Sequence, residues 1–434
     1  MSHLLDTSFP VAPLRRFVLE LTDGPFGSSL TSSHYSEDGA RVIRLGNIGS
    51  AEFRNNDEAY IPLDYFNSLR RHEVVPGDLI IAGLGDQNHP VGRACVAPKG
   101  LGPAIVKADC FRARLDESRL LHRYSAWALS SSAISQQILT LTRGTTRARI
   151  NLDLVRDIEL PIPSVEEQGR IADFLNAETA RIDKLTAMRE RQVSLLRERL
   201  MATWAQVIND DARDSAWSPI RRFITAITDG PFGSALTSNH YSDDGARVIR
   251  LGNLGRAEFR ERDPAYISLK YFSELRRHEA LPGDLIVAGL GDQNHPLGRA
   301  CVVPKDLGPA MVKADCFRLR LNQRRILHEY AAWALSSPPV TDQVTLLARG
   351  STRARINLEV ARDIPLPVPS IERQRRSIAV LGEMRFAMND IISQCRRQVT
   401  LLTERRQALI TATVTGQFDV TTASGRNVTE GVSA

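Results

Sequence analysis

The side chains best suited to bind a ligand lie in a basic loop that occurs twice. The stretch RGTTRAR places Arg143, Arg147 and Arg149 within seven positions, together with the hydroxyl groups of Thr145 and Thr146. A guanidinium group can neutralise a phosphate or pair bidentately with guanine, so this loop is suited to contact nucleic acid. A solvated basic turn is the alternative interpretation. The second copy, RGSTRAR, carries the corresponding residues Arg349, Ser351, Thr352, Arg353 and Arg355.

A second polar loop, GDQNHP, also occurs twice, letter for letter. Gln87 and Asn88 carry the amide group that reads adenine in the major groove, and His89 stands beside them. The alternative is an Asx-type turn before Pro90, in which the polar side chains serve the backbone. The second copy places the same groups at Gln293, Asn294 and His295.

A third loop, GPFGSSLTSSHY, offers hydroxyl and imidazole groups that could contact a nucleic-acid backbone. The candidates are Ser28, Ser29, His34 and Tyr35. Structural turn chemistry explains the same composition and is slightly favoured here. The corresponding residues of the second copy are Ser234, His240 and Tyr241.

The sequence lacks the motifs of several kinds of enzyme. It contains no G-x-x-x-x-G-K-[ST] phosphate loop, no N-P-P-Y or D-P-P-Y motif such as adenine methyltransferases use, and no Cys/His pairs at zinc spacing. Isolated histidines in polar turns, such as His34, His72 and His89, are typical of hydrogen-bonding surface groups. We therefore expect no catalytic residue, no metal and no bound cofactor.

These loops recur because most of the chain is duplicated. Residues 21–166 match the residues 206 positions further on without a gap, and roughly 70% of the paired positions are identical. A period near 200 is too long for a solenoid repeat, so each copy is a domain large enough to bury its own core.

Each copy combines a β-rich part with a helical part. Short apolar runs such as ARVIRLGNI and GDLIIAGLG, punctuated by Gly and Pro, predict strands joined by tight turns. Residues 120–139 have helical spacing, with Trp127 on the apolar face, where a core position is favoured. An α+β globular domain is expected.

A long helix follows each globular part, after the stretches LPIPSVEEQ and LPVPSIERQ, whose Pro-Ser predicts a capped helix start. Apolar residues from Ile378 to Leu409 recur at steps of three and four, interrupted only by Arg385 and Arg406. This heptad pattern predicts two helices of roughly 40 residues that pair as an antiparallel coiled coil, with pseudo-two-fold symmetry. The expected boundaries are 1–165 and 220–371 for the globular domains, 166–208 and 372–415 for the helices, 209–219 for a linker and 416–434 for a polar tail.

Composition narrows the class of protein further. The net charge is +6 and the content of charged residues is 24%, which fits nucleic-acid binding without proving it. No apolar run approaches the length of a membrane span, and the odd number of five cysteines argues against a secreted disulfide framework. A cytoplasmic protein with buried, reduced thiols is expected.

The chain resembles the specificity subunits of type I restriction-modification systems. The resemblance depends on LTDGPFGSSL, RLGNI, PGDLIIAG and TRGTTRARINLDLVRDIELPIPSVEEQ, present in this order in both copies, and on ATVTGQFDV after the last helix. It covers nearly all 434 residues. Members of this family commonly carry two dissimilar recognition domains, whereas the two copies here are nearly identical.

The resemblance implies two target-recognition domains, two spacer helices and no catalysis in this subunit. It also implies three partners: double-stranded DNA, two DNA-adenine methyltransferase subunits that use S-adenosylmethionine, and restriction and translocase subunits that use ATP and Mg²⁺. A bipartite, interrupted palindromic target is expected. The alternatives are a DNA-reading subunit of another phage-defence system and a single-chain DNA-modifying enzyme with a divergent site.

Overall fold

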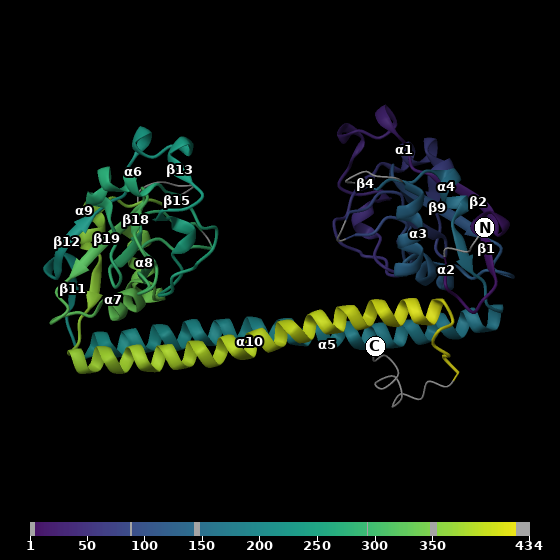
Figure 1. Ribbon diagram of the computed structural model, residues 1–434. Helices are drawn as coiled ribbons and strands as arrows, with labels where there is room; N and C mark the ends of the chain where they lie inside the picture. The colour runs from purple at the N-terminus through teal and green to yellow at the C-terminus, as the bar shows by residue number, and fades with distance from the viewer. Residues whose placement is uncertain (1–4, 87–88, 143–147, 293, 348–353, 422–434) are drawn as a thin grey trace. The chain divides into compact units, whose positions relative to one another are not determined.

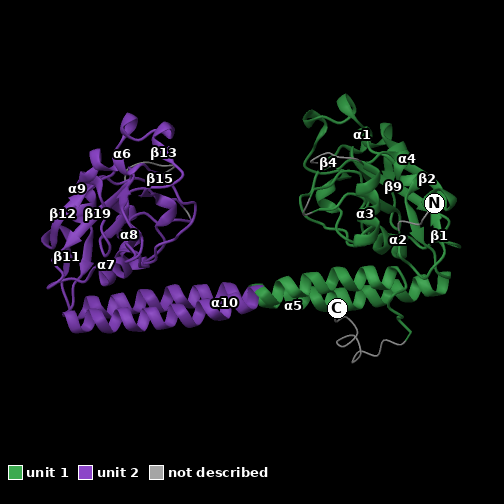
Figure 2. Ribbon diagram, in the orientation of Figure 1, with its two compact units in different colours: residues 1–190, 397–434 green, residues 191–396 purple. Residues whose placement is uncertain are grey.

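The computed structural model describes residues 5–86, 89–142, 148–292, 294–347 and 354–421. The chain divides into two compact units (Figure 2): residues 1–190 with 397–434, and residues 191–396. Each unit contains one globular part and one portion of each of two long helices (Figure 1).

The globular part of the first unit contains two four-stranded sheets. One is antiparallel, with the strand order β2-β9-β6-β7, and the other has the order β4-β3-β8-β5, in which β3 and β8 are parallel. A separate pair joins β1 to β10. The strands are β1 Val11–Pro13, β2 Val18–Asp23, β3 Ala40–Ile43, β4 Tyr60–Ile61, β5 Glu73–Val74, β6 Leu79–Ala82, β7 Ala94–Val96, β8 Ala104–Val106, β9 Cys110–Leu115 and β10 Glu159–Pro161.

The second unit repeats this arrangement. Its sheets have the orders β12-β19-β16-β17 and β13-β15-β14-β18, and β11 pairs with β20. The strands are β11 Trp217–Pro219, β12 Ile224–Thr228, β13 Tyr241–Ser242, β14 Ala246–Ile249, β15 Tyr266–Ile267, β16 Leu285–Ala288, β17 Ala300–Val302, β18 Ala310–Val312, β19 Cys316–Leu321 and β20 Pro365–Pro367.

Strand β6 shows how the first globular part is packed. All four of its residues are buried, because Leu79 and Ile81 point into the core beneath the helices while Ile80 and Ala82 point into the core between the sheets. Cys95 lies in the second of these cores, where burial raises the pKa of its thiol to about 12. All five cysteines are free and buried, as predicted.

Short helices cover the other face of the antiparallel sheets. The single helix predicted over residues 120–139 is in fact two helices, because the chain breaks at Ser130 and Ser131, where the Ser130 hydroxyl bonds to the backbone of Ala94 in β7. Trp127 is buried, as predicted. The short helices are α1 Leu63–Ser68, α2 His122–Leu129, α3 Ser132–Thr142, α4 Leu152–Asp157, α6 Leu269–Glu274, α7 His328–Leu335, α8 Pro338–Leu347 and α9 Leu358–Asp363.

The two long helices are α5, Val165–Arg213, and α10, Ile371–Val414. Each start is capped by the predicted serine: the Ser164 hydroxyl accepts from the amide of Glu167, and Ser370 does the same in the second copy. Helix α5 continues through residues 209–213, where the sequence predicted the linker. The reason is Asp211, which is fully buried and accepts hydrogen bonds from Ser377 and Arg373 at the start of α10.

Within each unit the two long helices run antiparallel. In the first unit Asp183 of α5 pairs with Arg406 of α10, and Phe174, earlier in α5, stacks on Phe418, beyond the end of α10. In the second unit Val193 packs with Ile392 and Cys395, while Asp211 meets the start of α10. The predicted coiled-coil pairing is therefore confirmed within each unit.

The two arginines that interrupt the heptad pattern contact the globular parts. Arg385 lies over the ring of Trp333, 4.1 Å from its centroid, and donates to the carbonyls of Arg256 and Ala257. Arg406 lies 5.9 Å from the ring of Trp127. Both guanidinium groups thus connect a long helix to the domain beside it.

Among the described residues, no helix has both the length and the apolar character that a membrane crossing requires.

Candidate nucleic-acid interface

Two of the predicted loops are joined directly through their backbones. Leu84, which precedes the GDQNHP loop, forms a β-bridge with Arg149 at the end of the arginine loop. The amide of Gly85 donates to the carbonyl of Ala148 at 3.0 Å, and the amide of Ile150 donates to Gly83 at 2.9 Å. Segments more than 60 residues apart in the sequence are therefore held side by side.

The third loop reaches the same place through Phe26. The guanidinium group of Arg149 lies 5.8 Å from the centroid of the Phe26 ring, a cation–π distance, and that ring is 45% exposed. The second copy repeats the contact between Arg355 and Phe232, at 5.7 Å. All three loops thus converge on one surface in each unit.

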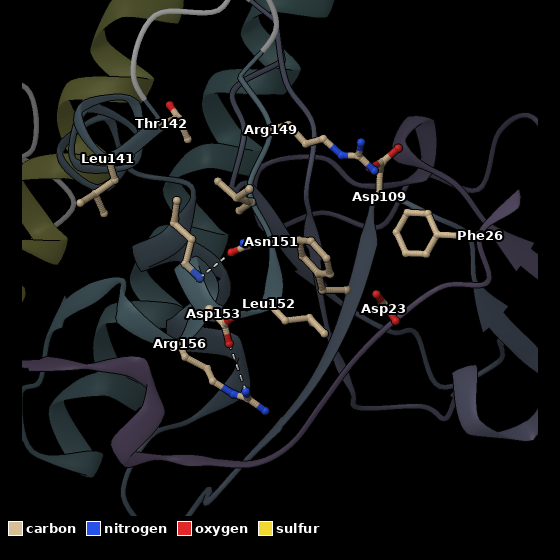
Figure 3. Close-up of a pocket in the computed structure, with 13 residues that line it drawn as sticks. Asp23, Phe26, Asp109, Leu141, Thr142, Arg149, Asn151, Leu152, Asp153 and Arg156 are labelled. Carbon is tan, nitrogen blue, oxygen red and sulfur yellow. Dashed lines mark hydrogen bonds and ion pairs between the residues drawn. The ribbon is translucent and has the colours of Figure 1, made fainter.

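A pocket of about 710 Å³ opens between the arginine loop and the third loop of the first unit (Figure 3). Its walls include the ring of Phe26, the carboxylates of Asp23 and Asp109, and the guanidinium groups of Arg149 and Arg156. Arg149 reaches Asp109 beside the Phe26 ring (Figure 3), with an Nη2–Oδ1 distance of 2.8 Å. The arginine loop therefore has a carboxylate partner that its local sequence does not reveal.

The second unit has an equivalent pocket of about 580 Å³. Arg355 again pairs with a carboxylate, Asp315, at 2.8 Å. Burial raises the pKa of Asp229, on the wall of this pocket, to about 6. Because both ion pairs are more than half exposed at the arginine, they orient the side chain and add little to stability.

The pocket is built on a strained backbone. Asp109 and Asp315 have φ angles of 66° and 64°, in the left-handed region that costs a non-glycine residue free energy. Beside them, a Cβ atom at Gly24 would lie 2.1 Å from the carbonyl carbon of Lys107, so only glycine allows the two segments to approach. Strain retained in both copies at the mouth of a pocket is typical of a functional site.

A buried arginine holds the GDQNHP loop in place. Arg93 is 5% exposed, and its guanidinium group donates to five backbone carbonyls, those of Leu45, Ile48, Leu84, His89 and Pro90. Arg299 makes the same set of bonds in the second copy. Both described ends of the loop are therefore held by one rigid group.

The turn chemistry within this loop is also visible. A carboxylate oxygen of Asp86 accepts from the amide of His89 at 2.8 Å, which is the Asx-type turn considered from the sequence. In the second copy Asp292 accepts from the amides of Asn294 and His295, and these bonds hold the pKa of that carboxyl below its ordinary value. The acidic residue of each copy thus shapes the described part of the turn.

The histidine of the third loop belongs to a small aromatic platform. His34 accepts from the amide of Thr31 and stacks on Tyr65 with a ring separation of 4.5 Å, and the Tyr65 hydroxyl donates to the carbonyl of Ser29. The second copy repeats this stack with His240 and Tyr271. The Tyr35 hydroxyl is buried without a partner among the residues that the structure describes. Four of the predicted residues thus lie in a segment whose hydrogen bonds run mainly within the segment and to Tyr65: Ser28, Ser29, His34 and Tyr35.

His72 corrects one expectation. It was grouped with surface histidines, but it is only 3% exposed and bonds to the Asp23 carbonyl and to Arg71. Burial, helped by Arg71, lowers its pKa, so the ring is neutral and joins β2 to the turn before β5. His278 occupies the equivalent position.

Several predicted contact residues lie outside the described residues. They are Gln87, Asn88, Arg143, Thr145, Thr146, Arg147, Gln293, Arg349, Ser351, Thr352 and Arg353. The predicted residues that are described and not yet placed are Ser234, which lies in the turn after Phe232, and Tyr241, which starts β13.

Sequence reasoning missed Phe26, Asp109 and Arg93. An available signal for Phe26 was its position between Gly24-Pro25 and Gly27, where a large apolar residue cannot join a strand or helix. Asp109 had no such signal, because its role depends on a strand that returns to the loop from 40 residues away. Arg93 follows a glycine at the start of a strand. Many surface arginines occupy such a position, so the sequence does not mark Arg93 as buried.

The chain is similar to proteins of a known family. Residues 53–194 match the family model described as the type I restriction modification DNA specificity domain. The chain is 20% identical over 426 residues to the specificity subunit of the type I restriction enzyme EcoBI of Escherichia coli, an alignment that covers 92% of this chain and 84% of the relative. The chain is related to the type I specificity subunits. The resemblance predicted from the sequence is thereby confirmed.

Further relatives of the same kind support this assignment. The type I specificity subunit of EcoKI from Escherichia coli K12 is 22% identical over 291 residues, which is 65% of this chain and 61% of that one. Among solved structures, the HsdS subunit from Thermoanaerobacter tengcongensis superposes with a TM-score of 0.54 at 16% identity, covering 94% of this chain and 97% of the other. A structure described as showing complex assembly and conformational transition of the type I R-M system gives 0.71, also at 16% identity, over 94% and 98%. The type I specificity fold is therefore shared along the chain.

Proposed function

We propose that this chain is the DNA-reading subunit of a type I restriction-modification complex, and that it carries no catalytic site of its own. The observation that carries the proposal is a strained pocket lined by the arginine loop and the third loop, with the GDQNHP loop paired to the arginine loop, repeated in each unit. Phe26 with Arg149, and Phe232 with Arg355, offer an exposed ring and a guanidinium group in a fixed geometry. Such pairs suit a nucleic acid, whose bases stack and whose phosphates carry negative charge.

The near-identity of the copies defines the target. Two readers with the same loops select the same sequence, so both halves of the target carry it. We infer that the two halves of the target are inverted copies of one sequence. The target is then an interrupted palindrome, with one methylated adenine in each half on opposite strands.

The long helices supply a surface for two copies of a partner. Leu185 and Leu195 on α5 are 41% and 48% exposed, and their equivalents Ile391 and Leu401 on α10 are 39% and 53% exposed. These four residues, termed here the outer stripe, lie off the coiled-coil seam. The first unit presents Leu185 and Leu401, and the second presents Leu195 and Ile391. Because each unit exposes one such apolar pair, the outer stripe fits two identical subunits. We assign it to the methyltransferase subunits; restriction subunits then join the assembly.

Methylome sequencing tests the function. Cells that express the chain with its methyltransferase subunit are expected to carry methyladenine in both halves of an interrupted palindrome. Cells that express the chain alone are expected to carry none, and purified chain is expected to transfer no methyl group from S-adenosylmethionine. Methyl transfer by the chain alone, or a target with unrelated halves, would contradict the proposal.

Charged substitutions in the outer stripe test the partner surface. Leu185→Lys with Ile391→Lys is expected to weaken binding of the methyltransferase subunits at least tenfold, because a lysine must be desolvated at the interface. The matched control is Leu63→Lys with Leu269→Lys, a repeat-related pair that is 54% and 58% exposed but lies on α1 and α6. Equal loss in both variants, measured by titration of the partner, would remove the outer stripe from the interface.

A further inference from the structure

One charged contact of the first unit is missing from the second. In the first unit Glu20 on β2 accepts from two arginines of the neighbouring β9: its Oε2 lies 2.5 Å from Arg112 Nη1 and 3.0 Å from Arg114 Nη1. These bonds hold the pKa of Glu20 below its ordinary value, with the hydrogen bond from Arg112 as the main cause. The equivalents of the arginines are Arg318 and Arg320, but the equivalent of Glu20 is Ala226.

Arg318 is therefore a buried cation without a counterion. It is 8% exposed, and its guanidinium group makes no hydrogen bond or ion pair with any residue that the structure describes. Burial lowers its pKa, and the positive charge of Arg320 adds to the effect. A buried guanidinium group in this situation is costly, so an anion that reaches it binds favourably.

The surrounding charges leave this position open to an anion. The charge of Asp284 acts on Arg318, but this carboxylate already accepts from the Nε and Nη2 of Arg320. Glu279 pairs with Arg276, and the Nε of Arg277 donates to His278. The positive charge of Arg318 further lowers the pKa of His278. No described carboxylate of the second unit takes the place of Glu20 beside Arg318. The Nη1 atom of Arg320 corresponds to the Nη1 atom of Arg114, which donates to Glu20 in the first unit.

We propose that Arg318 and Arg320 bind a phosphate group in the space that the Glu20 carboxylate fills in the first unit. The first unit demonstrates the geometry, because the corresponding arginines, Arg112 and Arg114, hold the Glu20 carboxylate between them. A phosphate offers several acceptor oxygens and can bridge two guanidinium groups, as a carboxylate does. Ala226 ends at its Cβ, so the space is not occupied by its own side chain.

The source of the phosphate is the DNA backbone. This step depends on the proposed function, which brings a duplex to each unit. Charge favours the same conclusion: residues 220–371 contain 21 basic and 16 acidic side chains, against 18 and 17 in residues 14–165. The second recognition part thus makes one phosphate contact, whereas in the first part the Glu20 carboxylate takes the place of that phosphate. The two parts therefore read the same bases but bind the DNA backbone differently.

Inorganic phosphate provides a test that is independent of DNA. The melting temperature of the full-length chain is measured against phosphate concentration at constant ionic strength, with chloride as the balancing anion. Wild-type chain is expected to show a saturable, phosphate-specific rise. Ala226→Glu, which installs the carboxylate of the first unit, is expected to melt higher without phosphate and to lose the phosphate-specific rise. Glu20→Ala is expected to melt lower without phosphate and to bind a second phosphate.

The outcomes separate the alternatives. A phosphate response in Ala226→Glu equal to that of wild type, or no additional binding in Glu20→Ala, would overturn the site. Weaker binding of the methyltransferase subunits to Ala226→Glu, with an unchanged phosphate response, would overturn it in favour of an acidic side chain of a partner.

The salt dependence of DNA binding by the assembled complex identifies the source. If Arg318 contacts the DNA backbone, Ala226→Glu lowers the slope of log K against log salt by about one. An unchanged slope, together with a lost phosphate response, supports the site but overturns DNA as its ligand in favour of free phosphate. If the chain binds no DNA in any complex, the proposed function fails while the phosphate titration still decides the site.

Discussion

At the residue scale, the pair Arg149 and Arg355 is the sharpest probe of the interface. Each guanidinium group is fixed between a carboxylate and an exposed ring, so its loss removes an oriented contact and leaves the core intact. Arg149→Ala with Arg355→Ala is expected to cost about 1–3 kcal/mol per half-site if the contacts are to bases. If they are to phosphates, affinity falls equally for all sequences and the salt slope decreases. Competition binding of the assembled complex with specific and nonspecific duplexes distinguishes these results, and unchanged binding would exclude both arginines from the interface.

Arg93 tests how the GDQNHP loop is held. Lysine has the same charge but cannot direct donors to five carbonyls, so Arg93→Lys leaves several buried acceptors unpaired, at about 1–3 kcal/mol. Hydrogen exchange of residues 84–92 is expected to accelerate. The equivalent loop, clamped by Arg299, is an internal control that keeps its protection. Equal acceleration in both loops would indicate general unfolding and contradict a local clamp.

The buried His72 predicts a dependence on pH. Its folded pKa is lowered from 6.5, so below pH 6.5 the unfolded chain binds a proton that the folded chain does not. The contribution of the neutral ring is complete above that pH and is lost as the pH falls toward the folded pKa. The difference in unfolding free energy between wild type and His72→Gln is therefore expected to shrink between pH 7.5 and pH 5. A difference that is constant or grows over this range would contradict a neutral, buried ring.

At the scale of elements, Asp211 fixes the end of α5 to the start of α10. It is fully buried and bonded to Ser377 and Arg373, so Asp211→Ala leaves the buried Ser377 hydroxyl unpaired, while the Arg373 side chain, 33% exposed, can turn to water. Loss of the acceptor of a buried hydrogen-bonding group costs about 1–3 kcal/mol. The control is Asp210→Ala, which removes an exposed pair with Arg213 and is expected to cost under about 1 kcal/mol. Chemical denaturation measures both, and similar small losses would show that Asp211 does not anchor the helix.

The elements also show what the sequence could and could not predict. The capping Ser164, the heptad spacing and the Gly-bounded apolar runs are local signals, and each predicted its element correctly. The break at Ser130 and the extension of α5 to Arg213 depend on bonds to Ala94 and Ser377, which lie far away in the sequence. The pocket belongs to the second kind: Arg149 was predicted as a contact, but its partners Asp109 and Phe26 come from other segments.

At the scale of the whole molecule, the shared heptad phase of the two long helices allows one to replace the other. A half-chain of residues 1–214 is therefore expected to pair with itself and, with the methyltransferase subunits, to modify the same sites as the full chain. In such a dimer Leu200, Trp204 and Ile208 take the positions of Arg406, Ile410 and Val414. The polar seam residues Thr179, Thr186 and Arg189 weaken this pairing. Methylome sequencing of cells with the half-chain decides the matter: no methylation despite a folded half-chain would show that the helices are not interchangeable.

The core of the first unit has a consequence for biosynthesis. Ile171 and Leu175 of α5 pack in one cluster with Leu409 and Val414 of α10, which the ribosome adds more than 200 residues later. At about 5–20 residues per second, the first globular part waits roughly 10–50 s for that helix. The second globular part waits far less, because Trp204 and Ile208 have already been made and Leu381 of α10 follows directly after it. During the delay, apolar surface of the first unit is open to the long helix of a neighbouring nascent chain, so exchange between chains on one messenger competes with correct closure.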